Sequence, residues 1–437
     1  TAVEPNEEYF KAGYQDACDV FDFHIYERPE DIRKTIHEYR ALMKQYKCEK
    51  PLWSTEIGLN SQGLTRQFIS GDMARKFAAF FAEGGANMNW FDLLYPDGDG
   101  KALGTSGDSF NLFDSRYNAY AARLDAVMCY NLINGICEKK FADEKAWADG
   151  QHGVLWRNEA GKCFAVLWKD AGRADVFLPL TGAKDVRVTR IDGRRSTLQA
   201  SGKGIGLGIS VDPILIAYDG TAKLPEKLDA APLQITAAPT RLMRGAPGIV
   251  DIATTADPKT VTLSAPLGWT VTSDAKQPLR VTVTSPETSL AREGDLLVHI
   301  TGADGAITAE TSIRPVLTGR LAVEVKAQVA VAGGKPAVQV VVSNQSPQPQ
   351  TITWTVSLTG ERALVNGQYA APTPTSAFLA DAGNGSLTIA GNSQGTATVP
   401  LSGVVAGKLY TAGASITDAT GGVIMAEGEL RELMPAK

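Results

Sequence analysis

The sequence predicts a multidomain protein in which an α/β segment precedes all-β domains. Over the first part of the chain, short apolar runs typical of buried strands alternate with helical patterns, and this alternation indicates a parallel sheet. Further along, short strands separated by turn signals follow one another, as they do in β-sandwiches. A chain of 437 residues is long enough for about three domains.

Three apolar runs are predicted to be the strands of the parallel sheet: residues 20–26, 51–58 and 87–94. Each carries polar or aromatic side chains near its end, and His24, Glu56 and Trp90 follow one another at intervals of 32 and 34 positions. One βα unit of a (β/α)₈ barrel takes about 31 residues. The spacing therefore predicts successive strands of a TIM barrel, with these three residues meeting at one rim.

Helical patterns fill the intervals between the predicted strands. Residues 28–46 carry one apolar stripe, and Pro29 suits the first turn of that helix. Residues 65–83 form a second apolar pattern, which ends at Gly84-Gly85. We expect a third helix at residues 117–132, after a loop at 95–109.

All-β patterns fill the rest of the chain. His152–Arg157 and Cys163–Trp168 flank a turn-like segment and predict a hairpin in a small antiparallel domain. Residues beyond a linker at 220–231 are poor in aromatics and fit two immunoglobulin-like sandwiches. We therefore expect four parts: residues 1–138 as a partial TIM barrel, 139–220 as the small β domain, and 232–318 and 319–437 as the sandwiches.

Composition excludes some classes of function. The formal net charge is −5 with no long basic run, which argues against nucleic acid as a partner, and no apolar stretch reaches the length of a membrane span. Five cysteines cannot all pair within one chain. We expect buried free thiols, with Cys129 and Cys137 as the pair closest to forming a bridge.

The order of three motifs resembles a known family. His24-Ile25-Tyr26, Trp53-Ser54-Thr55-Glu56 and Asn89-Trp90-Phe91 are similar to the last three strands of a clan A glycoside hydrolase barrel, most of all the β-xylosidase, α-L-iduronidase and endoglycosidase type. The small β domain, with Trp156 and Trp168, resembles the sandwich that those enzymes append. The resemblance covers about half of the 437 residues and implies the C-terminal portion of a (β/α)₈ TIM barrel.

The resemblance also implies a site. In that family the glutamate that closes strand seven is the nucleophile of a retaining mechanism, and the matching residue is Glu56. Tyr26 is then expected to donate a hydrogen bond to Glu56, and Trp90 to stack on the sugar ring. The expected substrate contacts at the strand ends are His24, Tyr26, Asn89, Trp90 and Asp92. Each of these residues also has a structural alternative. Glu56 is then a surface or salt-bridged glutamate, His24 a histidine of the core, and Trp90 a tryptophan that only packs.

The sequence departs from the family in its second carboxyl group. A retaining pair needs two carboxyls about 5–5.5 Å apart, and the family supplies the acid as Asn-Glu at the end of strand four. Asn6-Glu7 matches that dipeptide but precedes the helix that leads into the first strand, so we reject it. Glu27 and Asp92 are weak surrogates at the rim. We expect the acid/base to come from an upstream segment or a second chain that completes the barrel.

Two other classes of function remain open. The chain is alternatively a non-catalytic carbohydrate-binding or structural surface protein with a degenerate barrel, or a structural chain of an assembly. Other motifs add little, because Asp97–Lys101 departs from a calcium loop and Gly204–Gly208 has no strand-to-helix context for phosphate. Trp269 and Trp354 are expected in cores. We expect an oligosaccharide or polysaccharide substrate, no cofactor or metal, and an extracellular or periplasmic location.

Overall fold

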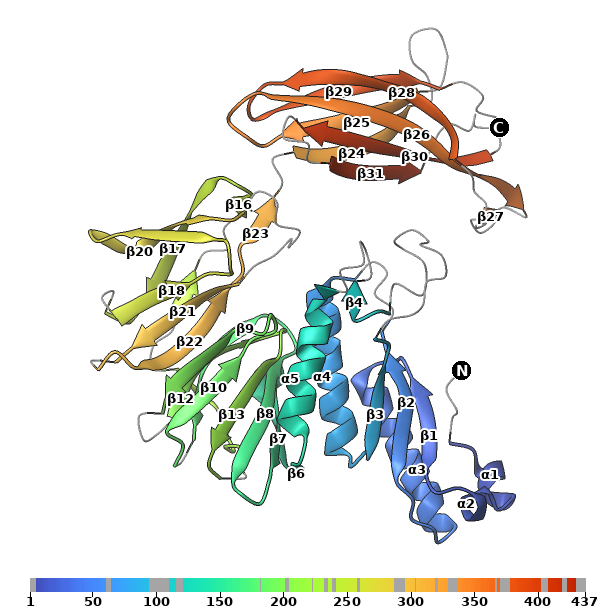
Figure 1. Cartoon of the computed structure of the whole chain (residues 1–437), viewed down its shortest axis with the longest axis vertical. Coiled ribbons are helices and arrows are strands. Elements are labelled where there is room, and N and C mark those ends of the chain that lie inside the picture. The colour runs from blue at the N-terminus through green and yellow to red at the C-terminus, as the bar shows by residue number, and fades with distance from the viewer. Residues whose placement is uncertain are drawn as a thin grey trace. The chain divides into compact units, whose positions relative to one another are not determined.

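The chain is mostly β-sheet and divides into two compact units. The first comprises Thr1–Thr236, Ala253–Ser264 and Leu297–Ser312, and the second comprises Ala237–Ile252, Ala265–Leu296 and Ile313–Lys437. The computed structural model (Figure 1) describes residues 5–59, 64–93, 110–114, 121–180, 182–200, 204–221, 223–231, 235–237, 241–257, 260–286, 295–302, 304–318, 321–328, 337–365, 368–369, 378–401, 408–418 and 423–429.

The first unit begins with a three-stranded parallel sheet. Its strands are β1 (Phe21–Ile25), β2 (Leu52–Gly58) and β3 (Asn87–Phe91), in the order β1-β2-β3. The three predicted strands are therefore confirmed, as is their parallel pairing. Three strands do not close a barrel, so the (β/α)₈ assignment stays a prediction.

Two long helices cover one face of this sheet. Helix α3 (Pro29–Gln45) buries Ile32, Ile36 and other residues of its apolar stripe in a core shared with Phe21 and Phe23 of β1. Helix α4 (Arg66–Ala82) starts where the Thr65 hydroxyl accepts a hydrogen bond from the Phe68 N–H at 3.2 Å. Both helices match the predicted ranges to within one residue at each end.

Short elements surround the parallel sheet. Helices α1 (Glu7–Lys11) and α2 (Tyr14–Ala17) precede β1, and the two-residue strands β4 (Phe113–Asp114) and β5 (Ala121–Ala122) pair before the next long helix. That helix, α5, spans Leu124–Ile136. The predicted range of 117–132 was wrong at both ends; its first residues, 117–120, and the predicted loop at 95–109 lie outside the described residues.

An antiparallel sheet follows α5, in the order β11-β10-β13-β8-β7-β6. A short 3₁₀ turn, η3 (Ala148–Gly150), connects β6 to β7, and the predicted hairpin of β7 and β8 is confirmed by their antiparallel pairing. The strands are β6 (Lys140–Trp147), β7 (Gln151–Arg157), β8 (Lys162–Lys169), β10 (Asp185–Thr189), β11 (Arg195–Gln199) and β13 (Ile214–Asp219).

A second six-stranded sheet has the order β14-β9-β12-β22-β21-β18. Strands far apart in sequence meet in it, because β12 pairs with β22 in parallel through Gly206 and Ala309. The strands are β9 (Arg173–Pro179), β12 (Gly204–Ser210), β14 (Asp229–Ala230), β18 (Val261–Ser264), β21 (Leu296–Thr301) and β22 (Ile307–Ile313).

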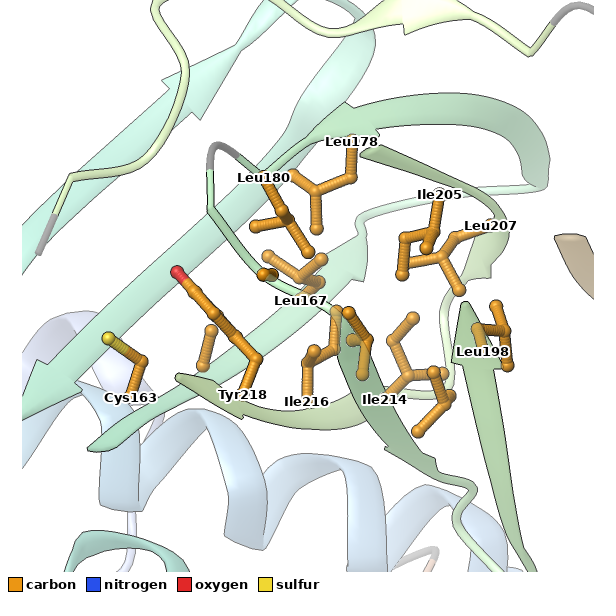
Figure 2. Close-up of a cluster of buried hydrophobic side chains, with 14 of the residues drawn as sticks. Cys163, Leu167, Leu178, Leu180, Leu198, Ile205, Leu207, Ile214, Ile216 and Tyr218 are labelled. Carbon is orange, nitrogen blue, oxygen red and sulfur yellow. The ribbon is translucent and has the colours of Figure 1, made fainter. Parts of the chain in front are cut away.

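Hydrophobic cores hold these layers together. Figure 2 shows side chains of one core, in which Leu167 and Ile216 of β8 and β13 gather with Leu178 and Ile205 of β9 and β12. A second core joins α4 and α5 to the opposite face of the β6–β13 sheet, where Trp156 is almost fully buried. Successive side chains of a strand point to opposite faces of a sheet. Because both faces of this sheet carry a core, the central strands β7 and β8 are buried almost continuously.

A buried ion cluster connects β22 to the first antiparallel sheet within the first unit. The Arg190 Nε lies 2.6 Å from Glu310 Oε1, and these side chains are 4% and 0% exposed. The other carboxylate oxygen of Glu310 lies 2.8 Å from His299 Nε2. The guanidinium also donates to the Gly208 carbonyl of β12 at 3.0 Å, so the cluster links several strands that are distant in sequence.

The second unit is all β. Its strands β16 and β23 pair in parallel, and β17, β20 and β19 pair antiparallel in that order. Strand β15 (Ile235–Ala237) lies at the boundary of the two units in the sequence. The other strands are β16 (Arg241–Met243), β17 (Pro247–Thr254), β19 (Thr270–Asp274), β20 (Gln277–Thr284) and β23 (Val316–Thr318).

The remaining strands of the second unit enclose a core that includes Val340, Ile352 and Ala414, against which Trp354 packs as expected. Trp269 is partly buried. The sheets have the orders β24-β25-β29 and β27-β26-β30-β31, with β28 also paired to β26. The strands are β24 (Leu321–Gln328), β25 (Ala337–Asn344), β26 (Gln350–Val365), β27 (Gln368–Tyr369), β28 (Phe378–Ile389), β29 (Ser393–Pro400), β30 (Lys408–Asp418) and β31 (Val423–Glu429).

The predicted sandwich at residues 232–318 is shared between the two units. Strands β18, β21 and β22 belong to the first unit, whereas β16, β17, β19 and β20 belong to the second. Because long-range pairing decides this division, turn signals along the chain did not reveal it. The four-part division of the sequence stays a prediction.

The cysteines are all free. Cys129 is buried in the second core and Cys137 is exposed, and no bridge joins these two residues, which were predicted to be the pair closest to forming one. Cys163 is buried, whereas Cys18 and Cys48 are partly exposed. Within the described ranges, no helix has both the length and the apolar character needed to cross a membrane.

Candidate active site

A β-bulge shapes the uncovered face of the parallel sheet. Asp22 lies opposite Trp53 and His24 lies opposite Glu56, so two steps along β1 match three along β2. The extra residue interrupts the alternation of side chains. Thr55 and Glu56 therefore both reach the face that α3 and α4 do not cover, and side chains of both contact His24.

The Glu56 carboxylate is held at both oxygens. The Tyr26 hydroxyl, just beyond β1, donates a short hydrogen bond to Oε1. The His24 Nδ1 lies 2.6 Å from Oε2, and the two side chains are 30% and 27% exposed. Hydrogen bonds to a carboxylate favour its ionised form, while partial exposure leaves it open to a ligand.

Tyr26 is fixed by an aromatic pocket. Its ring meets Phe91 and Phe110 edge-on, with centroids 6.3 and 5.7 Å away. Burial raises the pKa of Tyr26, and the hydrogen bond to Glu56 and the charges of Glu56 and Asp92 raise it further. Tyr26 is therefore a neutral hydrogen-bond donor to Glu56 throughout the physiological range of pH.

A buried lysine ties the strand ends to α4. Lys76 is fully buried, and its Nζ donates to the carbonyls of Tyr26 and Gly58 at 3.0 and 2.9 Å. It also forms an ion pair with Asp72, one turn earlier on α4, at 2.9 Å. Since Tyr26 and Gly58 follow the site residues of β1 and β2, this ammonium fixes the backbone on which those residues stand.

Trp90 lies on the other face of the sheet from Glu56. Its register partner is Ile57, which is buried under the helices, and Trp90 packs partly buried against both helix-lined cores. Its ring centroid lies 5.9 Å from the Lys76 Nζ. His24 and Glu56 thus meet on the uncovered face of the sheet. Trp90 is connected to these residues only indirectly, through Lys76, which contacts both the Trp90 ring and the Tyr26 carbonyl.

The other expected contacts lie at the end of β3. Asn89 is exposed, and its side-chain oxygen accepts from Asn87 at 3.4 Å. Asp92 is partly buried near Tyr26, and its backbone pairs with residues 110 and 112. Neither shares a direct hydrogen bond with the Glu56 carboxylate, whose described partners are Tyr26 and His24.

The carboxyls considered as acids have other roles. Asn6 accepts the Glu8 N–H and so begins α1, while Glu7 accepts from Gln45 at the end of α3 and from Tyr46, the residue after it. Asn6-Glu7 is thus part of helix packing, which agrees with its rejection. The exposed Glu27 accepts the Tyr26 N–H at 2.9 Å and faces solvent.

A groove of about 510 Å³ lies elsewhere in the first unit, lined by α5 and by strands β8, β10, β11 and β13. Its two carboxylates are already engaged, Asp219 by Lys162 at 2.8 Å and Asp185 by the Gln199 amide. It lacks the free paired carboxyls with which glycosidic bonds are usually hydrolysed. In the part of the chain that the structure describes, no cluster of His, Cys, Asp or Glu could hold a metal ion.

Asp22, Thr55 and Lys76 contribute to the site but were not predicted. The motif that contains Thr55 was visible in the sequence, but strict alternation places Thr55 and Glu56 on opposite faces. Lys76 looked like a polar position on a helix, and only the three-dimensional path of β1 and β2 reveals its carbonyl partners.

Comparisons with known proteins give weak matches. A scan against protein-family models finds none, and a search of curated proteins also finds none. Among solved structures, a family 39 glycoside hydrolase from Bacteroides cellulosilyticus WH2 is 15% identical with a TM-score of 0.41, covering 48% of this chain and 46% of that one. A glucosidase from Croceicoccus marinus is 13% identical with a TM-score of 0.37, covering 50% and 59%.

A GH27 β-L-arabinopyranosidase from Geobacillus stearothermophilus is 8% identical with a TM-score of 0.28, covering 49% of this chain and 48% of that one. The chain thus spans about half the length of each of these three enzymes. At these TM-scores the likeness carries no argument about function. A functional assignment therefore depends on the side chains of the site.

Proposed function

We propose that this chain carries the nucleophile of a retaining glycoside hydrolase and that Glu56 is that nucleophile. The observation that supports this most is the paired hold on Glu56, with Tyr26 on one oxygen and His24 on the other. A carboxylate nucleophile must be ionised, oriented and reachable. Two donors orient Glu56, and a side-chain exposure of 27% leaves it reachable.

The general acid/base is proposed to come from a polypeptide segment outside this sequence. Asp22 is a poor candidate, because the Thr55 N–H and hydroxyl both donate to its carboxylate, at 2.8 and 2.6 Å. Such bonds favour the ionised form, whereas a general acid must hold its proton. A partner segment that supplies a protonated carboxyl about 5–5.5 Å from Glu56 completes the pair.

The substrate is proposed to be an oligosaccharide or polysaccharide, bound on the uncovered face of the sheet. Trp53 is 37% exposed on this face, opposite Asp22 in register. An exposed aromatic ring offers an apolar surface for a sugar ring. Since Trp90 lies on the helix side, Trp53 is the better placed of the two for stacking near Glu56.

The test is hydrolysis of a panel of 4-nitrophenyl glycosides by the protein in its native assembly. Glu56→Ala should lower kcat at least about 10⁴-fold, the scale seen when a nucleophile or essential carboxylate is removed, while circular dichroism stays unchanged. Glu49→Ala is the matched control, because this exposed glutamate precedes β2 at the far end of the same strand. Near-normal turnover by Glu56→Ala would refute the assignment.

The retaining mechanism has its own readout. A 2-deoxy-2-fluoroglycoside with a good leaving group should trap the glycosyl-enzyme, and mass spectrometry should place the label on the peptide that contains Glu56. Labelling of another carboxylate overturns the role of Glu56. Oligosaccharide binding without any turnover by the assembled protein favours the alternative, a carbohydrate-binding protein with a degenerate site.

A further inference from the structure

Four side chains form a continuous hydrogen-bonded chain on the uncovered face of the parallel sheet. The Thr55 hydroxyl lies 2.6 Å from Asp22 Oδ2 and 3.0 Å from His24 Nε2. The other ring nitrogen of His24, Nδ1, lies 2.6 Å from Glu56 Oε2. The Thr55 backbone N–H also donates to Asp22 Oδ1 at 2.8 Å, which fixes the far end of the chain.

The number of protons in this chain follows from its hydrogen bonds. Three hydrogen bonds join the four side chains, and each requires one proton. The hydroxyl of Thr55 supplies one proton and a neutral His24 ring supplies one. Ionised Asp22 and Glu56 supply none. The three hydrogen bonds therefore need three protons, but two ionised carboxylates, a hydroxyl and a neutral imidazole supply only two. The four side chains together hold one additional proton.

The surroundings determine where this additional proton resides. Asp22 receives both the N–H and the hydroxyl of Thr55, and these bonds favour an ionised carboxylate. Glu56 receives the hydroxyl of Tyr26, with the same effect. The ring of His24 lies between the two carboxylates, with Nε2 also 3.5 Å from Asp22 Oδ2.

Two elements packed near the site carry further charged side chains, one acidic and one basic. Asp92, after β3, lies close enough to Tyr26 to act on it electrostatically, and Lys76 of α4 contacts the carbonyls at the strand ends. Lys76 is already paired with Asp72. The two carboxylates that contact the ring, Asp22 and Glu56, therefore leave an excess of negative charge beside it, which attracts a proton.

We infer that His24 is an imidazolium and that Asp22 and Thr55 are positioning residues that hold its proton and orientation for Glu56. The hydroxyl of Thr55 donates to Asp22 and so accepts from the Nε2–H of His24. The Nδ1–H of His24 then donates to Glu56 and keeps that carboxylate ionised. The link to nucleophilic attack rests on the proposed function, but the protonation state does not.

The chain contains only four histidines, which makes ring-nitrogen NMR a direct test. Protein labelled with ¹⁵N-histidine should show one ring at pH 7 with both nitrogens protonated that disappears in His24→Gln. In Thr55→Val and Asp22→Asn, this ring should change to the neutral pattern, and Thr55→Ser should restore the imidazolium. Thr197→Val, on an exposed position of β11, is the matched control and should leave the signal unchanged.

Two results overturn the inference: a neutral His24 ring in the wild-type protein, or an imidazolium that persists in both Thr55→Val and Asp22→Asn. Valine suits a strand, so Thr55→Val should keep the fold, and unchanged circular dichroism verifies this. Glycoside hydrolysis in parallel separates the two proposals. An imidazolium without any turnover supports the inference and refutes the proposed function. Turnover with a neutral ring supports the proposed function and refutes the inference.

Discussion

Replacing Arg190 by methionine tests how far the first unit depends on one buried ion pair. The substitution removes the guanidinium that lies 2.6 Å from the fully buried Glu310 and that also donates to the Gly208 carbonyl. Glu310 keeps only hydrogen bonds from His299 and Ser196. A buried carboxylate without its cation is strongly destabilising, whereas replacing both partners by apolar groups often is not.

The magnitude follows from the carboxyl group itself. Burial alone raises the pKa of Glu310, but the charge of Arg190 and the hydrogen bonds from His299, Ser196 and Arg190 outweigh burial and lower the pKa from 4.5 to about 2. At 1.36 kcal/mol per pKa unit, a difference of about 2.5 units corresponds to about 3 kcal/mol. We therefore expect Arg190→Met to lower the free energy of unfolding by about 3–5 kcal/mol at pH 7.

The pH dependence has a defined sign. Because the pKa of Glu310 is lower in the folded state than in the unfolded state, its stabilisation is fully present above pH 4.5 and is lost as the pH falls towards 2. Protonation of Glu310 removes the charge that Arg190 compensates. The penalty of Arg190→Met should accordingly shrink as the pH is lowered through this window.

Urea denaturation followed by tryptophan fluorescence is a suitable assay, since five of the seven tryptophans, 53, 90, 147, 156 and 168, lie in the first unit. Lys162→Met is the control, because Lys162 and Asp219 form a mostly exposed pair at 2.8 Å, expected to contribute less than about 1 kcal/mol. Adding Glu310→Leu to Arg190→Met should recover much of the loss. A penalty below about 1 kcal/mol at pH 7, or one that is as large at pH 3 as at pH 7, refutes the reasoning.

Three further predictions concern other parts of the chain. Lys76→Met should lower the free energy of unfolding by about 3–5 kcal/mol, because it leaves Asp72 and two strand-end carbonyls without their cation; a urea midpoint like that of the wild type contradicts this. Gly208→Ala should cost about 1–3 kcal/mol, since a Cβ there overlaps the hydroxyl of Thr311 on β22; the same titration measures it. With Ellman's reagent, the exposed Cys137 should react in the native protein, whereas Cys129, whose pKa burial raises to about 11, should react only after unfolding; equal rates contradict this.

Local signals predicted the first half of the chain well. The ends of α3 were found to within one residue because Pro29 and the apolar stripe act locally. The start of α5 was missed by seven residues, and its N-cap residue, Arg123, makes no side-chain capping bond that the sequence could have revealed. Elements with a local cause were therefore predictable, and the one without a capping signal was not.

Long-range pairing lay beyond local signals. The residues of β18, β21 and β22 read as strands of a separate sandwich, yet they pair with one another or with β12 in the first unit. The buried partners of this arrangement, Arg190 and Glu310, are 120 positions apart. Each looks like an ordinary surface charge in sequence, because nothing near either residue indicates the other.

The candidate site depends on a single additional residue in β2. In a regular strand, side chains alternate between faces, so Thr55 and Glu56 would lie on opposite sides of the sheet and His24 could reach only one of them. The bulge places both beside His24, and Asp22 joins them through Thr55. A sequence pattern cannot show this irregularity, yet it places the strand-end Glu56 in a hydrogen-bonded assembly that orients its carboxylate.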